Sequence, residues 1–225
     1  LAERMKLDPL KLYTTDKFWE ADEGGHLSRT DTQRVVAARM LADLAVLHPD
    51  KRDELLVAED PVLIWATDRP QPHANALRYL SSVKSDKGLT QMRDWAFPKD
   101  PLPKEGAQPP FPIAFETAQS ALRYIGRYKD DASFQKLLDQ FKRKKEPKMD
   151  ITQDGLMGAG LSLLGMSLRA VAYGAAQGLG EWGDPRAVKP MMELIEDELW
   201  HEEARIAACE GLAWCAEPKD LQEIA

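Results

Sequence analysis

The sequence predicts an all-α fold, an α-solenoid in which antiparallel helix pairs stack into a right-handed superhelix. The first observation is a repeat, because a pattern in residues 171–182 returns 33 positions later in residues 204–215. The matching positions are Val171, Gly174, Ala175, Gly178, Leu179 and Trp182, which return as Ala204, Ala207, Ala208, Gly211, Leu212 and Cys215. A fixed period of this size is typical of stacked supersecondary units.

The second observation is the spacing and size of the repeated residues. They fall at i, i+3, i+4 and i+7, which is one face of an α-helix. Most are alanine or glycine, and glycine inside a helix costs up to about 1 kcal/mol relative to alanine. Gly174, Gly178 and Gly211 therefore indicate that helix backbones approach one another closely.

The third observation is a set of helix-ending and helix-starting residues after the first copy of the repeat. Gly183 suits the left-handed position that closes a helix, Asp184 suits an N-cap, and Pro185 suits the first helical position. An apolar stripe then predicts a second, antiparallel helix. The stripe consists of Val188, Met191, Met192, Ile195 and Leu199. The predicted unit is helix, tight turn, helix.

Weaker copies precede this unit. Equivalent leucines are predicted at Leu44, Leu80, Leu122, Leu179 and Leu212. We expect a lead-in over residues 1–30 and degenerate repeats over 31–143, which contain a proline-rich insertion at 98–112 that cannot be regular helix. A linker follows at 144–155, and regular repeats occupy 156–225, with the last one truncated at the C-terminus.

The segment from Ala175 to Val188, AAQGLGEWGDPRAV, resembles the HEAT-like repeats named after phycobilin lyases. The resemblance is specific over residues 168–221 and loose over 31–143. It implies an elongated surface, for which we favour a non-catalytic scaffold or adaptor that binds a protein partner. It also implies two alternatives, a bilin lyase or isomerase, and a nucleic-acid-repair module, since some DNA glycosylases are built from HEAT-like helices.

Composition narrows the partner class. The formal charge of −7 argues against generic nucleic-acid binding, which depends on neutralising phosphates. The two cysteines, Cys209 and Cys215, lie six apart on one predicted helix, point in different directions and are expected to stay reduced, which favours a cytoplasmic protein. The most apolar stretch, residues 156–168, is shorter than the about 20 residues that a membrane span needs.

The candidate contact surface is a row of arginines. A concave solenoid face is usually lined by the second helix of each pair, and we expect these arginines there, off the core stripe. They are Arg39, Arg78, Arg123, Arg169 and Arg205. Arginine suits carboxylate or phosphate partners because it donates in a fork. Trp214 is a candidate interface anchor. The alternative is that the arginines pair with glutamates of the adjoining repeat.

Three further motifs are weak. His201-Glu202 is similar to one iron-binding pair of deoxyhypusine hydroxylase, but that enzyme needs several converging pairs. The glycines at 155–160 lack the preceding strand of a phosphate-binding loop. The basic run at 142–145 suits a helix C-terminus, with contact to an acidic partner or a nucleic acid as the alternative. We therefore predict no catalytic, metal or cofactor residues, and we favour a protein that is not an enzyme.

Overall fold

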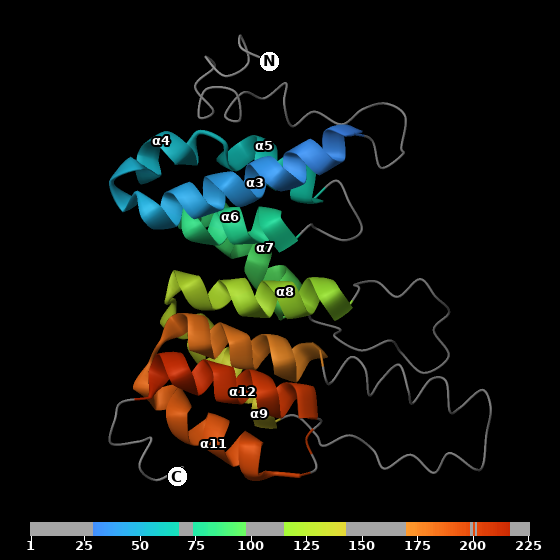
Figure 1. Ribbon diagram of the computed structural model, residues 1–225, viewed down its shortest axis with the longest axis vertical. Helices are drawn as coiled ribbons and strands as arrows, with labels where there is room; N and C mark the ends of the chain where they lie inside the picture. The colour runs from blue at the N-terminus through green and yellow to red at the C-terminus, as the bar shows by residue number, and fades with distance from the viewer. Residues whose placement is uncertain are drawn as a thin grey trace, which may run out of the picture. The chain divides into compact units, whose positions relative to one another are not determined.

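The computed structural model describes residues 29–67, 74–97, 115–142, 170–198, 200 and 202–216. Every regular element within these ranges is a helix, which confirms the all-α prediction for this part of the chain (Figure 1). The expected insertion at 98–112 and the linker at 144–155 lie outside the described residues, as does nearly all of the lead-in at 1–30.

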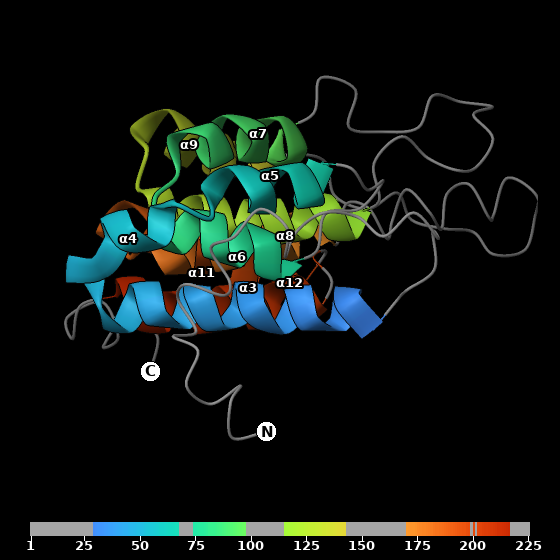
Figure 2. The same ribbon diagram turned by 90° about the horizontal axis from the view of Figure 1, so that it is seen from above.

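The chain divides into two compact units, Leu1–Gln91 and Met92–Ala225, which we call unit 1 and unit 2. Unit 1 contains α3 (Arg29–Leu47), the 3₁₀ turn η2 (Pro49–Lys51), α4 (Arg52–Leu56), α5 (Glu59–Thr67), α6 (Ala74–Ser82) and the start of α7 (Asp86–Ala96). Helix α6 packs on α3 and also on α5 (Figure 2). Its core face includes Leu77 and Leu80, both fully buried.

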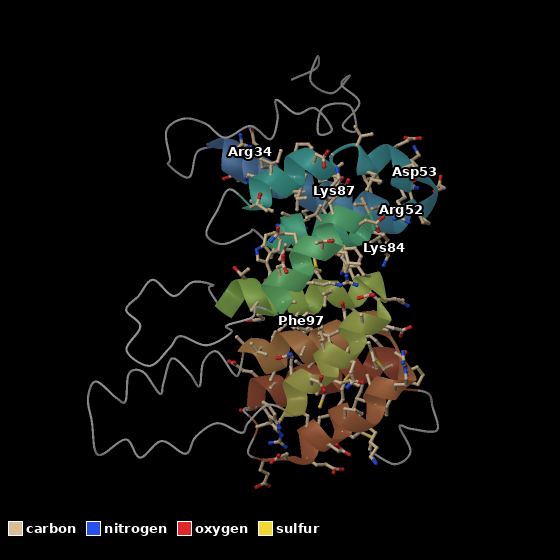
Figure 3. The ribbon with its side chains drawn as sticks, turned by 180° about the vertical axis from the view of Figure 1, so that it is seen from behind. Arg34, Arg52, Asp53, Lys84, Lys87 and Phe97 are labelled. Carbon is tan, nitrogen blue, oxygen red and sulfur yellow. The ribbon has the colours of Figure 1, made fainter. Side chains whose placement is uncertain are left out.

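Hydrogen bonds from Tyr79 and Arg52 join α6 and the turn that follows it to α4. The hydroxyl of Tyr79 donates to the carbonyl oxygen of Leu55 at 2.5 Å. Arg52 donates through Nε to the carbonyl of Val83 at 2.5 Å and through Nη2 to that of Lys84 at 2.9 Å (Figure 3). Arg52 thereby supplies donors to carbonyls at the end of α6 that the helix leaves without intrahelical partners.

Unit 2 contains the rest of α7, α8 (Phe115–Ile125), the 3₁₀ turn η3 (Gly126–Tyr128) and α9 (Asp131–Lys142). A helix at residues 170–182, η4 (Pro185–Ala187), α11 (Val188–Glu196) and α12 (Glu202–Cys215) complete it. The 170–182 helix, orange in Figure 1, lies between α8 and α12, while α11 packs on α12 and α9. The apolar face of α11 is centred on Val188, Met191 and Leu194, so Leu194 is buried where Ile195 was expected.

The repeated glycines place helix backbones in direct contact, as their spacing predicts. A Cβ built on Gly174 would lie 2.5 Å from the carbonyl oxygen of Gln119, and one on Gly178 would lie 2.1 Å from that of Leu122. On the other face, a Cβ on Gly180 would lie 2.8 Å from the Cα of Gly211. Residues 171–182 therefore lie beside residues 204–215, and no side chain larger than hydrogen fits at these crossings.

Three helix pairs turn in the same way. The turn residues Lys84, Lys129 and Gly183 have φ values of 55°, 55° and 70°. The next residue caps the following helix in each case. Ser85 Oγ accepts from the Gly88 amide at 2.7 Å, Asp130 Oδ2 from the Ser133 amide at 3.1 Å, and Asp184 Oδ1 from the Arg186 amide at 2.8 Å. The predicted roles of Gly183 and Asp184 are confirmed.

This shared turn corrects the predicted register of one repeat. The buried residue four positions before each turn residue is Leu80, Ile125 or Leu179. Ile125, rather than Leu122, is thus the equivalent of Leu179. Leu122 is also fully buried, one helical turn earlier on the same face, so the apolar pattern alone did not separate the two.

Candidate partner-binding surface

Unit 2 has a surface pocket of about 410 Å³ across α8 with η3, the 170–182 helix and α12. Three of its lining residues are small. Gly180, Gly211 and Ala207 line it and present at most a methyl group. A Cβ on Gly180 would lie 2.8 Å from the Cα of Gly211, so the two helices are in direct backbone contact beneath the pocket.

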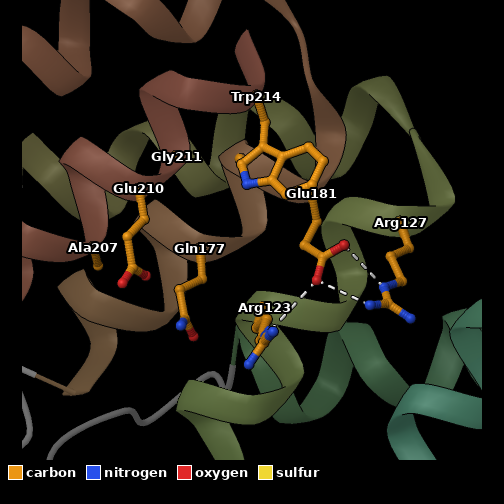
Figure 4. A pocket seen from close by; sticks show the side chains of 9 residues that line it. Arg123, Arg127, Gln177, Glu181, Ala207, Glu210, Gly211 and Trp214 are labelled. Atoms are coloured by element: carbon orange, nitrogen blue, oxygen red, sulfur yellow. Dashed lines mark hydrogen bonds and ion pairs between the residues drawn. The ribbon is translucent and has the colours of Figure 1, made fainter.

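An arginine–glutamate–arginine cluster forms one side of the pocket. Arg127 donates to Glu181 in a two-pronged arrangement, with Nη2 to Oε1 at 2.9 Å and Nε to Oε2 at 3.1 Å. Arg123 Nε lies 3.5 Å from Glu181 Oε1 (Figure 4). Both guanidinium groups lie over the Tyr124 ring, at 5.5 Å for Arg123 and 5.1 Å for Arg127. Glu181 thus satisfies chiefly Arg127, and the Arg123 side chain is 42% exposed.

The other side of the pocket is formed by Glu210 and Trp214 on α12. They are four residues apart, so both side chains project from one helix face. Trp214 is 77% exposed, although Leu212 and Cys215 beside it are buried. Among the described residues, no cation lies within ion-pair distance of the Glu210 carboxylate. Figure 4 shows Gln177 beside Glu210, while Glu181 points toward Arg127.

The pocket side chains occupy two equivalent positions in three successive repeats. Arg127 and Glu181 each lie two residues before a turn residue, Lys129 and Gly183, and Trp214 follows Glu181 by the period of 33. The position one helical turn earlier is held by Arg123, Gln177 and Glu210. The first row begins with Arg127 on η3 and ends with Trp214 on α12, and the second begins with Arg123 on α8 and ends with Glu210 on α12.

The predicted arginines are largely occupied by contacts within the chain. Arg78 on α6 pairs with Asp43 on α3, and Arg39 Nε lies 3.9 Å from the same Asp43. Arg205 Nε donates to the carbonyl of Ile195 at 2.7 Å, near the C-terminus of α11. Of these arginines, Arg123 pairs with a glutamate of the adjoining repeat, Glu181, whereas Arg78 pairs with an aspartate and Arg205 with a backbone carbonyl. Arg169 lies outside the described residues.

The expected location of these arginines on the second helix of each pair is wrong. Arg78 and Arg123 lie on α6 and α8, which precede their turns and are the first helices of their pairs. Arg205 lies on α12, the counterpart of the first helix at 170–182. Of the predicted contact residues, the pocket brings together Arg123 and Trp214.

Sequence reasoning missed Arg127, Gln177, Glu181 and Glu210. Glu210 had a usable signal, because it precedes Trp214 by one helical turn. Arg127 and Glu181 become visible as one repeat position only after the register is counted from the turn residues. The pairing between them depends on the spacing of two helices, which no local pattern contains.

A family model described as HEAT repeats matches residues 161–225. This match supports a HEAT-like repeat protein, and HEAT repeats commonly mediate protein interactions. The matched residues include the 170–182 helix and α12, which supply most of the pocket. The match is to HEAT repeats in general and does not single out the phycobilin-lyase type. No curated protein matches the chain.

None of the helices in the described ranges combines the length and apolarity that crossing a membrane requires. No three His, Cys, Asp or Glu side chains gather there in a way that could hold a metal ion. His201, half of the weak iron-binding motif, lies outside the described residues.

Proposed function

We propose that the protein is a non-catalytic scaffold or adaptor that binds a protein partner through the pocket face of unit 2. We further propose that its helix pairs stack into a right-handed α-solenoid. The recurring turn geometry and the close glycine contacts support the stacking of pairs. The two free cysteines, one of them exposed, support a reducing compartment and hence the cytoplasm.

The exposure of Trp214 is the observation that carries this proposal. Its equivalent in the preceding repeat is Glu181, a residue suited to a solvated helix face. An indole there is buried only slightly by folding, since 77% of Trp214 stays exposed. Covering it would remove on the order of 150 Å² from water, or about 4 kcal/mol at 25 cal/mol per Å² before binding costs. Tryptophan and arginine are also the residues most enriched among interface hot spots.

The arginine contacts favour a protein partner over DNA. A DNA-binding channel needs cations that are available to phosphates. Arg78, Arg127 and Arg186 are each paired with a carboxylate, and Arg205 is bound to a backbone carbonyl. The bilin-related enzyme remains a prediction from the resemblance alone.

The test is affinity capture from the native source with the immobilised chain. Wild type is compared with Trp214→Ala and with Leu47→Ala, a matched control on α3 whose side chain is 72% exposed. We expect wild type and Leu47→Ala to retain the same partner. Trp214→Ala should bind the recovered partner at least ~30-fold more weakly, because a hot spot contributes 2 kcal/mol or more.

Stability is measured in parallel. Trp214→Ala should melt within a few degrees of wild type, because the side chain is exposed. A partner that binds wild type and Trp214→Ala equally well would contradict the proposal. Recovery of no specific partner by wild type would contradict it as well.

A further inference from the structure

We propose that the pocket recognises a basic side chain of the partner, preferably arginine, held between the Trp214 indole and the Glu210 carboxylate. This inference rests on the proposed function and specifies the chemistry of its partner.

The charged side chains of the pocket are unequally satisfied. Glu181 receives Arg127 at 2.9 Å and 3.1 Å and Arg123 at 3.5 Å. The two arginines thus approach Glu181 and lie over the Tyr124 ring. Glu210 is the pocket carboxylate that no cation of the described chain approaches within ion-pair distance. A cation from a binding partner could therefore form an ion pair with the Glu210 carboxylate.

Trp214 supplies the second contact for the same cation. A guanidinium or ammonium group over an indole face gains about 0.5–1 kcal/mol when exposed and ~2 kcal/mol or more when desolvated. Glu210 and Trp214 line one pocket from one helix face, so a single side chain can meet the carboxylate at its tip and the ring along its length. Arginine suits both contacts better than lysine, because its planar fork stacks on rings and binds carboxylates bidentately.

The pocket has room for one long side chain. Gly211 lies between Glu210 and Trp214 in sequence, and Gly180 and Ala207 face the same hollow. A volume of about 410 Å³ is at the lower end of ligand pockets. A pocket of this volume can hold one long side chain but not a whole secondary-structure element of a partner. The formal charge of −7 adds a long-range attraction for a basic partner.

The test uses short capped peptides, Ac-Gly-Ser-X-Ser-Gly-NH₂, in which X is Arg, Lys, Gln or Glu. Binding to the full chain is followed through the Trp214 indole N–H signal in NMR spectra, assigned with Trp214→Phe. We expect the Arg peptide to shift this signal saturably and to bind at least ~5-fold more tightly than the Gln and Glu peptides. The Lys peptide should fall between them.

Charge-removal variants locate the effect. Glu210→Gln should bring the Arg peptide to the affinity of the Gln peptide. Glu193→Gln removes an equal charge from α11, outside the pocket, where the side chain is 66% exposed, and should leave the preference intact. A Glu peptide that binds as tightly as the Arg peptide would overturn the proposal. Unchanged Arg binding in Glu210→Gln, or no shift with any peptide, would overturn it too.

Partner capture separates this inference from the proposed function. If Trp214→Ala loses the partner while Glu210→Gln keeps it at wild-type affinity, the surface binds a protein but not through a basic anchor. If Trp214→Ala keeps the partner, the proposed function itself fails. Loss of capture in both variants, with Glu193→Gln unaffected, supports both.

Discussion

Gly126 and Gly178 touch backbone to backbone, so that a Cβ built on Gly126 would lie 1.8 Å from the carbonyl oxygen of Gly178. The contact joins η3 to the 170–182 helix. A Cβ on Gly178 would in turn lie 2.1 Å from the carbonyl oxygen of Leu122. Neither distance can be relieved by turning a side chain, because both neighbours are main chain.

Gly178→Ala is therefore expected to destabilise unit 2 by about 3 kcal/mol or more, because the backbones must separate. Alanine would improve helix propensity by only about 1 kcal/mol, so the clash decides the sign. Urea unfolding of the variant measures the change. Gln177→Ala, one residue away and half-buried, should stay within about 0.5 kcal/mol of wild type. Equal stability of Gly178→Ala and wild type would refute the close approach.

Lys129→Gly is expected to stabilise the protein by about 0.5–1 kcal/mol. Lys129 has φ of 55°, a left-handed conformation that costs a residue with a side chain roughly 1–2 kcal/mol. The greater conformational freedom of glycine in the unfolded chain offsets part of that gain. The comparison variant is Gln135→Gly, at an exposed position inside α9, which should cost about 1 kcal/mol. Thermal melting of both variants checks the opposite signs.

The two thiols should differ in reactivity. Cys209 is exposed, whereas Cys215 is buried and its Sγ lies 3.2 Å from the carbonyl oxygen of Leu179, to which it donates. Burial raises the pKa of the Cys215 thiol to about 11, so almost none of it is thiolate near neutral pH. A disulfide reagent should modify one thiol quickly in the folded protein and both after denaturation. Cys209→Ser should lose the fast reaction, and rapid modification of that variant would count against a buried Cys215.

Asp184 should make the protein sensitive to acid. Hydrogen bonds from the Arg186 side chain and amide, which outweigh the effect of burial, hold the pKa of Asp184 below its ordinary value of 3.8. A lowered pKa contributes stability above that ordinary value, and the contribution is lost as pH falls through the lower folded pKa. Asp184→Asn keeps a capping side chain but removes the charge. Its unfolding free energy should fall less steeply than that of wild type below pH 3.8, and parallel profiles would refute the coupling.

The local features of the fold were predictable from single residues. A glycine after an amphipathic stretch closes a helix, an aspartate before a proline starts one, and glycines on an apolar face require a close neighbour. Gly183, Asp184 and Gly178 all behave in this way. The register of α8 was missed because its turn residue is Lys129, whose side chain gives no sign of a positive φ.

The site was only partly predictable. Trp214 attracted notice because a large aromatic side chain follows a core position, and Arg123 because it lies off the apolar stripe. Their meeting in one pocket depends on the distances between three helices. Arginine alone does not reveal whether it binds a partner or a neighbouring helix, and the contacts of Arg78 and Arg205 are internal.

Gly180 and Gly211 line the pocket and also form a backbone contact between two helices of unit 2, so the shape of the pocket depends on that helix packing. A Cβ at Gly180 would meet the Cα of Gly211 at 2.8 Å, and one at Gly211 would meet Met191 Sδ at 2.8 Å and the carbonyl oxygen of Ala176 at 3.0 Å, so a larger side chain at either position must displace packed atoms. Glu210 and Trp214, on one side of the pocket, are exposed, so their side chains can change without affecting this helix contact. In proteins built from such repeats, changes in binding specificity should therefore accumulate in the two rows of outward-facing residues, while the glycines in the helix contacts stay unchanged.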